Sequence, residues 1–292
     1  MSRKITCQNE NNLMLAFDDT FSPWLLENCD GIYVIKNTVA TSENTMTDGS
    51  TYQGSTASMR NIVLTLRDHP LSDHRGNRQI LYNLFKKDSK GVFTYYEDDI
   101  VRQINYYVED VDIDSVPRSR RATISLLCPD PFFVDLEDVS VKMAGWVAAF
   151  QWQHEFPAAG EPFGTRTAEY IKTIENESAA DHIGLTITIE ASGPATNPAV
   201  THVEQNESIC VGTSGNPLQM IAGDKVIITT HTNNKHAYLV RGGVKTDVNE
   251  YLSEDSEFLQ IMSGNNTFGY SADSGENYLS VTISFRYRYA GV

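Results

Sequence analysis

The sequence predicts a mainly β protein of two domains, with one α-helix in the first domain and an all-β sandwich as the second. The chain has 292 residues, more than one compact domain usually holds. It contains 14 Tyr and 12 Phe, which favour strands, and 19 Gly for turns. Two prolines within Cys128–Pro131 interrupt the run of strands. We therefore expect domains at residues 1–138 and 139–292.

The first domain is predicted to begin with short strands. The apolar run Leu13–Phe17 and the β-branched and aromatic stretch Gly31–Ile35 are typical of strands that join one sheet. Between residues 40 and 58 the composition changes to Thr, Ser, Asn and Gly, with Asp48-Gly49 at the centre. Because that composition is typical of a hairpin turn, we expect a long hairpin or loop that protrudes from the domain.

A helix is predicted after Pro70, over the segment Asp73–Lys87. Four apolar residues recur there at helical spacing and are expected to face the core: Ile80, Leu81, Leu84 and Phe85. Ser72 or Asp73 can cap the N-terminus, since a short polar side chain accepts a hydrogen bond from a free backbone amide. Lys86-Lys87 suits the negative end of the helix dipole.

Further strands are predicted on both sides of the domain boundary. They are Asn61–Leu66, Val92–Tyr96, Val101–Val108 and Ala122–Leu127 in the first domain, and Leu185–Glu190, Lys225–Thr230, Ala237–Val240 and Tyr278–Tyr289 in the second. In the last of these, apolar and polar residues alternate, which places every second residue from Leu279 to Tyr289 on one face. Arg286 and Arg288 are expected on the other face. Strands separated by Gly, Asn and Pro turns favour a β-sandwich.

The charge balance limits the classes of partner. The chain has 23 Lys and Arg against 38 Asp and Glu, a net charge of -15, which repels phosphate backbones and anionic lipids. No segment holds 18 consecutive apolar residues, and Met1–Asn12 lacks an apolar signal region, so we expect a soluble chain made in the cytosol. The four cysteines form no Cys-x-x-Cys pair and are expected to be reduced thiols, mostly in the core.

No motif points to catalysis. The sequence has no Gly-x-Ser-x-Gly elbow, and Gly242-Gly243 and Gly264 are not followed by the Lys-Ser of a phosphate loop. His231 and His236 lie five residues apart, where a hairpin can bring them together, but solvated histidines at a hairpin tip are commoner than a metal site. We therefore predict no catalytic, cofactor-binding or metal-binding residues.

Acidic clusters at three places suggest a calcium site or a glycosidase active site: Glu97–Asp99, Glu109–Asp114 and Glu254–Glu257. Asp110, Asp112 and Asp114 alternate with apolar residues, so we expect all three on one solvated face of a strand. Three tryptophans are compatible with stacking on sugar rings in a carbohydrate-binding sandwich, although scattered tryptophans are more often core or interface residues. They are Trp24, Trp146 and Trp152.

Several segments of the second half occur in the order of a known family: Gly193–Pro198, Ala222–Thr230, Asn234-Lys235 before a Tyr-Leu strand, Tyr251-Leu252, Ser256–Phe258, Ser263–Tyr270 and Leu279–Val292. The first half adds the polar loop around Asp48-Gly49, the strand Arg60–Leu66, the predicted helix and the exit Cys128–Phe133. On these residues the chain resembles, nearly from end to end, the distal tail proteins of siphophages. Asp224 after Gly223 and Asn265 after Gly264 suit tight turns, which are structural roles.

The resemblance implies an N-terminal ring domain, of β-sandwich type with one helix and a long hairpin, followed by a galectin-like, jelly-roll sandwich. It further implies a homo-hexameric ring at the tail tip of the virion, synthesised in the cytoplasm of the host bacterium. The ring would dock on the tail tube (major tail) protein and hold the tail-associated lysozyme or tail fibre protein. Receptor-binding or baseplate proteins are further expected partners, and DNA would only pass through the channel. The resemblance implies neither catalysis nor a membrane partner.

Two alternatives remain open at this point. A carbohydrate-binding adhesion module of the tail tip would bind sugars in a glycan screen, because fold and binding site are separable. An enzyme would lose activity when a carboxylate such as Asp99 is replaced, or would show a perturbed titration in a cleft.

Overall fold

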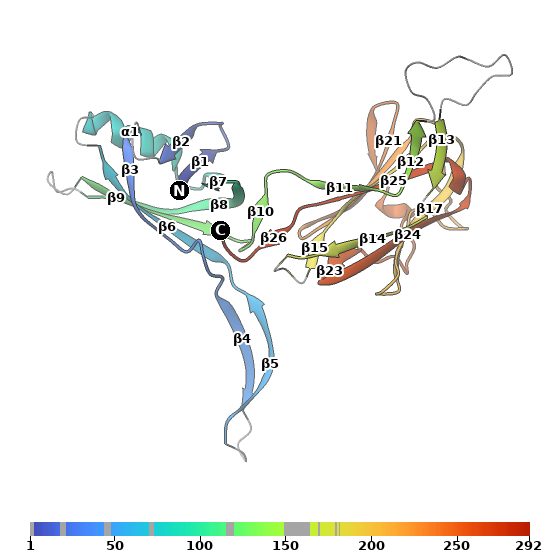
Figure 1. The fold of residues 1–292 in the computed structure, drawn as a ribbon, viewed down its shortest axis with the longest axis horizontal. Helices are drawn as coiled ribbons and strands as arrows, with labels where there is room; N and C mark the ends of the chain where they lie inside the picture. Colours follow the sequence, from blue (N-terminus) through green and yellow to red (C-terminus); the bar gives the residue numbers. More distant parts are fainter. Residues whose placement is uncertain are drawn as a thin grey trace. The chain divides into compact units, whose positions relative to one another are not determined.

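The computed structural model describes residues 3–17, 22–43, 48–69, 73–114, 120–148, 164–168, 170–178, 180 and 182–292. The chain divides into two compact units, Met1–Leu136 together with Arg288–Val292, and Glu137–Tyr287. Strands dominate both units, as the sequence predicts (Figure 1). The sequence predicts that the second domain continues to residue 292, whereas in the structure the chain returns to the first unit at Arg288.

The described part of the first unit is built on one antiparallel sheet, with the order β2-β1-β7-β8-β9-β6-β3, β10 beside β8 and β26 beside β10. Its strands are β1 Arg3–Asn9, β2 Met14–Phe17, β3 Trp24–Asp30, β6 Arg60–Asp68, β7 Lys90–Glu97, β8 Ile100–Ile113, β9 Arg121–Cys128, β10 Phe133–Asp135 and β26 Arg288–Tyr289. The predicted strands at Leu13–Phe17, Asn61–Leu66, Val92–Tyr96, Val101–Val108 and Ala122–Leu127 are thereby confirmed.

The predicted helix is confirmed as α1, His74–Leu84. The side chain of Asp73 accepts a hydrogen bond from the backbone amide of Arg75 (3.1 Å), so Asp73 is the N-cap. Leu81, Leu84 and Phe85 are buried against the sheet, and Ile80 is partly buried there. The apolar stripe therefore packs into the core, as expected from its spacing.

Two polar side chains fasten α1 to the sheet. Asp68, at the end of β6 and only 1% exposed, accepts hydrogen bonds from His74 Nδ1 (2.5 Å) and from the Asn77 side chain at the start of the helix. At the other end, the Asn9 amide donates to the carbonyl of Leu84 (3.3 Å). Because buried polar groups must be satisfied, these bonds restrict where the helix can lie.

The strand predicted at Gly31–Ile35 is wrong. Strand β3 ends one residue earlier, at Asp30, because Gly31 has a φ of +85°. A Cβ atom at this position would lie 2.0 Å from the carbonyl oxygen of Asn61, so only glycine allows the close approach. The apolar residues that follow form no described strand, and Tyr33 and Val34 are exposed.

The second unit contains two larger sheets. The six-stranded sheet has the order β11-β25-β16-β20-β21-β22, and the other has the order β14-β24-β17-β18 with β19 on β17. The strands are β11 Val139–Lys142, β14 Ile171–Asn176, β16 Thr186–Ala191, β17 Ala195–His202, β18 Glu207–Cys210, β19 Gln219–Met220, β20 Lys225–His231, β21 Asn234–Arg241, β22 Val244–Asp247, β24 Gly264–Ser274 and β25 Leu279–Phe285.

Smaller elements complete the unit. They are the ladders β12 Ala144–Ala148 with β13 Gly164–Ala168 and β15 His182–Gly184 with β23 Gln260–Met262, and the 3-10 turns η1 Asn249–Tyr251 and η2 Glu276–Tyr278. Along β16 and β25 buried residues alternate with partly exposed ones, and β24 buries Phe268 and Tyr270. Each large sheet thus buries one face, which is the arrangement of the predicted β-sandwich.

The long alternating strand predicted up to Tyr289 is wrong after Phe285. Leu279, Val281, Ile283 and Phe285 share the buried face, as expected. Beyond Phe285 the pairing partner changes, because Tyr289 lies opposite Phe133 of β10 in the first unit. The alternation is continuous in the sequence, but its residues pair with strands of two different sheets.

The turn before β20 depends on Asp224, which is 2% exposed. Its carboxylate accepts hydrogen bonds from the guanidinium of Arg241 (2.6 Å from Nη2) and from the backbone amide of Ile221 (2.8 Å). The hydrogen bonds from Arg241 lower the pKa of Asp224. Gly264 has a φ of +85° at the start of β24, so both turn roles expected from the sequence are confirmed.

His202 is a buried ring at the end of β17. Its side chain is 1% exposed, its Nε2 atom lies 3.4 Å from Glu204 Oε2, and the ring stacks on Phe268 with centroids 4.7 Å apart. Burial lowers the pKa of His202, although the Glu204 and Glu207 carboxylates act in the opposite direction. The folded second unit therefore favours the neutral ring.

We expect the second unit to lose stability in mild acid because of His202. The unfolded ring takes up a proton near pH 6.5, and the folded ring only at lower pH, so this contribution is complete above pH 7 and declines as pH falls from 6.5 towards the lowered pKa. One such proton changes the unfolding free energy by at most about 1.4 kcal/mol per pH unit. Urea unfolding between pH 5 and 7.5 should show a smaller acid loss for His202→Gln. The partly exposed His236 provides the control, and an unchanged slope in His202→Gln would contradict the prediction.

Candidate assembly interface

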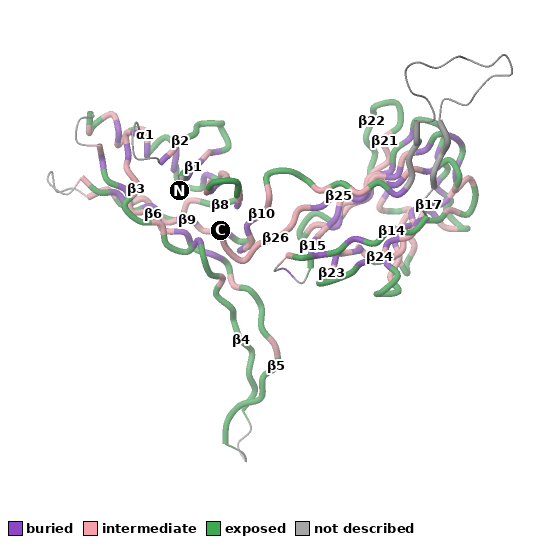
Figure 2. The backbone as a smooth tube through the Cα atoms, in the orientation of Figure 1, coloured by how far each residue is buried: buried purple, intermediate pink, exposed green. Residues whose placement is uncertain are grey.

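The most exposed element of the first unit is a hairpin that we call the arm, formed by β4 Asn37–Glu43 and β5 Ser50–Ala57. It leaves the sheet where β3 ends and β6 begins (Figure 1). Every residue of β4 is exposed, and so is every residue of β5 except the partly exposed Gly54 (Figure 2). The protruding loop predicted between residues 40 and 58 is therefore a paired β-ribbon with Asp48-Gly49 near its tip.

The arm has little to stabilise it within its own chain. Its cross-strand side-chain contacts are polar, such as Thr38 Oγ1 with Ser58 Oγ (2.7 Å) and Gln53 Nε2 with Ser42 Oγ (2.8 Å). An isolated two-stranded ribbon is only marginally stable in water. Glu43 is the only charged residue in the two strands, and a lack of charge is typical of a surface that another protein covers.

Exposed apolar side chains gather along the arm and at its root, and we call this set the arm patch. Its members, with their exposed fractions, are Tyr33 52%, Val34 74%, Val39 54%, Tyr52 64% and Met59 61%. Single exposed apolar residues are common, but five along one element and its two connections indicate an interaction surface.

The root of the arm is held by Arg60, the first residue of β6, which is 4% exposed. Its guanidinium donates to the carbonyl of Gly31 on the entering side of the arm (2.7 Å), of Pro131 (2.7 Å) and of Ala290 (2.5 Å). It also lies over the Phe133 ring, 4.8 Å from the centroid. Burial lowers the pKa of Arg60.

Sequence reasoning missed Arg60, because an arginine at the start of a strand carries no signal of its partners. The three carbonyls that it binds come from segments far apart in the sequence. Only the folded chain brings them around one side chain.

Of the tryptophans and histidines singled out in the sequence, Trp24, His231 and His236 have described side chains, and these three do not come together. Trp24 is fully buried, and its indole donates to the carbonyl of Asn77 (3.0 Å), so it is a core residue and no sugar platform. The side chain of Trp146 and all of Trp152 lie outside the described residues. His231 and His236 do lie on the β20–β21 hairpin, but His231 Nε2 contacts Thr186 (3.2 Å) whereas His236 Nδ1 contacts Asn249 (3.2 Å).

The acidic clusters bring no metal-ligating group together. Glu109 accepts hydrogen bonds from Asn61 and Ser125 (2.6 Å each), and Tyr95 donates to Glu97 (3.1 Å). Asp110 and Asp112 are exposed along β8, as predicted, whereas Asp114 follows the end of the strand and is partly buried. Within the described ranges no three His, Cys, Asp or Glu side chains are placed to hold a metal ion.

The cysteines are free thiols with weak acidity. Cys7 and Cys128 are buried and Cys29 and Cys210 are partly buried, as expected for core thiols. Burial raises the pKa of Cys29 and of Cys128 to about 12, so neither thiol is a ready nucleophile at neutral pH.

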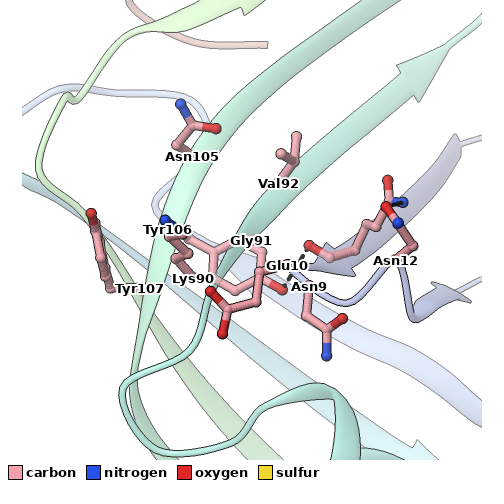
Figure 3. A pocket seen from close by; sticks show the side chains of 10 residues that line it. Asn9, Glu10, Asn12, Lys90, Gly91, Val92, Asn105, Tyr106 and Tyr107 are labelled. Atoms are coloured by element: carbon pink, nitrogen blue, oxygen red, sulfur yellow. Dashed lines mark hydrogen bonds between the residues drawn. The ribbon is translucent and has the colours of Figure 1, made fainter. Parts of the chain in front are cut away.

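A polar hollow of about 400 Å³ lies beside β1, β7 and β8 (Figure 3). Its lining includes Glu10, Lys90 and Tyr107, and no serine, cysteine or histidine. Several of its polar groups bind the chain itself, for example Gln8 Nε2, which donates to Asn12 (3.2 Å). The lining thus offers none of the serine, cysteine or histidine side chains that make up a hydrolase-type catalytic pair.

Two protein-family models match this chain and identify the kind of protein that carries the arm. A family model described as the C-terminal domain of siphovirus-type tail components matches residues 179–289. A second model, described as a phage tail protein RIFT-related domain, matches residues 20–128. The chain belongs to the siphophage distal tail protein family. The two matched ranges cover parts of both compact units, so the relationship extends over the whole architecture.

Solved structures share the fold of this tail component. The crystal structure of phage SPP1 Dit, described as a paradigm of the hub adsorption apparatus in phages that infect Gram-positive bacteria, is similar with a TM-score of 0.69 and 12% identity, over 98% of this chain and 99% of that chain. A chain of the phage P2 baseplate, activated with calcium, has a TM-score of 0.56 and 10% identity, with 100% of both chains covered. A search of curated proteins returned no match.

The chain is therefore a component of a phage tail, and its place is the virion. Helix α1 has 11 residues, too few to cross a membrane, and no described helix is longer.

Proposed function

We propose that this protein is the hub of a long-tailed phage tail tip, and that it forms a hexameric ring through the first unit. The observation that carries the proposal is the arm, an exposed and almost uncharged β-ribbon with the arm patch along it and at its root. A marginal ribbon of this kind gains stability when a neighbouring subunit covers it. Membership of the distal tail protein family supports the same assembly.

The first unit offers different surfaces for a head-to-tail contact. In the described sheet β2 and β3 are the two ends of the strand order, and the arm continues from the β3 end. A contact between two different surfaces on each subunit closes into a ring when the rotation per subunit permits. Six subunits would then surround a channel through which DNA passes, and the net charge of -15 would discourage DNA from binding to its wall.

The proposed partners follow from this position. The ring would dock on the last subunits of the tail tube protein and hold a tail-associated lysozyme or tail fibre protein, with receptor-binding or baseplate proteins as further partners. Its own role would be mechanical, without catalysis, and the chain would be made in the cytoplasm of the host bacterium.

The decisive experiment is the mass of the purified protein by light scattering, with negative-stain images of the same sample. A sixfold ring of six chain masses, each 32.6 kDa, is expected. A strict monomer at all concentrations would contradict self-assembly and would favour an independent binding module. For that alternative, a screen against cell-wall glycans is the test, since the carbohydrate-binding interpretation requires saturable binding.

We expect the double variant Val39→Ala/Tyr52→Ala to weaken ring assembly by at least about tenfold, because buried aromatic residues dominate most interfaces. The unfolding free energy should change by less than about 0.5 kcal/mol, since both side chains are more than half exposed. Light scattering across a dilution series measures the first effect, and urea unfolding measures the second.

A matched control replaces two equally exposed apolar residues of the second unit, Ile221 (54%) and Val244 (66%), by alanine. Rings of normal stability are expected for this control. If the arm variant assembled as well as the control, the arm patch would have no part in the interface.

A further inference from the structure

The last five residues of the chain, Arg288–Val292, belong to the first unit although the whole second unit precedes them. We call this segment the strap. Its strand β26 pairs with β10, with Phe133 opposite Tyr289 and Val134 opposite Arg288. The chain therefore leaves the first unit after β10 and re-enters it beside the same strand, so the second unit is inserted between two paired strands.

The strap ends against the root of the arm. The backbone amide of Val292 donates to the carbonyl of Ile32 (3.3 Å), and a Cβ atom on Gly291 would lie 2.4 Å from the carbonyl oxygen of Tyr33. Both partners are in the connection between β3 and the arm. In Figure 1 the C-terminus lies near the place where the arm leaves the sheet.

Two arginines of the sheet donate hydrogen bonds to backbone carbonyls of the strap. Arg60 donates to the carbonyl of Ala290 (2.5 Å) and Arg102 to that of Gly291 (2.5 Å), and Arg102 also lies over the Tyr289 ring, 3.8 Å from its centroid. The side chain of Arg288 pairs with Asp130 at the edge of β10. These contacts involve almost every residue of the strap.

Arg60 connects the strap to the arm most directly. The same guanidinium binds Ala290 of the strap and Gly31 at the entry of the arm, and Arg60 itself begins the strand that leaves the arm. Without the strap, one of its buried donors would lose its acceptor, and buried donors without acceptors are unfavourable. The position of Arg60, and with it the root, would then be less well defined.

We propose that the strap is a lock on the arm root, so that the arm reaches its assembly-competent geometry only when Arg288–Val292 is seated on the first unit. Folding of the second unit favours this contact, because it shortens the otherwise flexible connection between β10 and β26. Chains whose strap is not seated would carry a loose arm and stay out of rings. The link to assembly rests on the proposed function, whereas the lock itself does not.

The test compares the full-length protein with a variant that lacks Ala290–Val292 and with the single variant Gly291→Val, which places a side chain against the Tyr33 carbonyl. Amide hydrogen exchange of Ser58, whose backbone amide donates to Lys36 across the root (2.8 Å), reports on the arm root directly. We expect Ser58 to exchange at least tenfold faster in both variants. The amide of Phe85, bonded to Leu81 at the end of α1 (2.8 Å), should be unchanged and shows that the first unit is folded.

The matched control is Gly215→Val in the second unit, where an added Cβ would have no neighbour within 4 Å. Wild-type exchange at Ser58 is expected for this control. Unchanged amide hydrogen exchange at Ser58 in both strap variants would contradict the proposal that the strap holds the arm root, whatever the oligomeric state. Faster exchange with a monomeric wild-type protein would leave the lock standing and count against the ring, so the two proposals fail separately.

Discussion

Replacing Arg60 by methionine is expected to lower the unfolding free energy of the first unit by about 3 to 5 kcal/mol. Methionine has a similar length but no donor, so the carbonyls of Gly31, Pro131 and Ala290 lose their shared partner. The Arg60 side chain is 4% exposed, and of its three acceptors the Pro131 carbonyl is the buried one. Equilibrium unfolding in urea, followed by tryptophan fluorescence, measures the loss.

Arg67→Met is the matched control, because Arg67 lies on the same strand but is 49% exposed and pairs with Glu27 at the surface (2.6 Å). Exposed ion pairs contribute little, so a change below about 1 kcal/mol is expected there. Arg60→Lys should fall between the two, since one ammonium cannot reproduce the fork of a guanidinium. A loss below about 1 kcal/mol in Arg60→Met would show that the three carbonyls find other partners.

Trp24→Ala is expected to destabilise the first unit by about 3 to 5 kcal/mol. The indole is fully buried, and its Nε1 atom donates to the Asn77 carbonyl of α1 (3.0 Å). The substitution therefore leaves a cavity under the helix and removes the hydrogen bond from the indole to α1. Thermal or urea unfolding followed by circular dichroism gives the magnitude without depending on tryptophan emission.

The control for Trp24→Ala is the substitution of an aromatic residue on the arm. Tyr52 is 64% exposed, so Tyr52→Ala should change stability by less than about 0.5 kcal/mol while it weakens assembly. Equal losses for the two substitutions would mean that the arm is covered within its own subunit. The two substitutions thus distinguish an effect on folding from an effect on assembly.

The sequence predicted most strands and the helix because their signals are local. In α1 the helical spacing of Leu81, Leu84 and Phe85 and the capping side chain of Asp73 all lie within one element, and each has the predicted role. The hairpin signal at Asp48-Gly49 likewise depends on neighbouring residues alone, and it located the arm. Local patterns such as these reflect the geometry of one element and do not need the rest of the chain.

The errors occur where the decisive contact is distant in sequence. Gly31–Ile35 has a strand-like composition, but Gly31 turns the chain because its backbone approaches Asn61 too closely for a side chain. Leu279–Tyr289 alternates without a break, yet its end pairs with β10 of the other unit. Composition cannot reveal which strand a segment will meet.

From the sequence alone one could establish a two-domain, mainly β protein without catalytic motifs, and its resemblance to siphophage tail proteins. Only the tertiary structure decided how the arm is held: Arg60, Gly291 and the strap are unremarkable in the sequence. Their role comes from backbone carbonyls of residues 31, 131 and 290, which the fold brings around one guanidinium. Backbone carbonyls are the same in every residue, so no side-chain pattern marks those that a buried donor will bind.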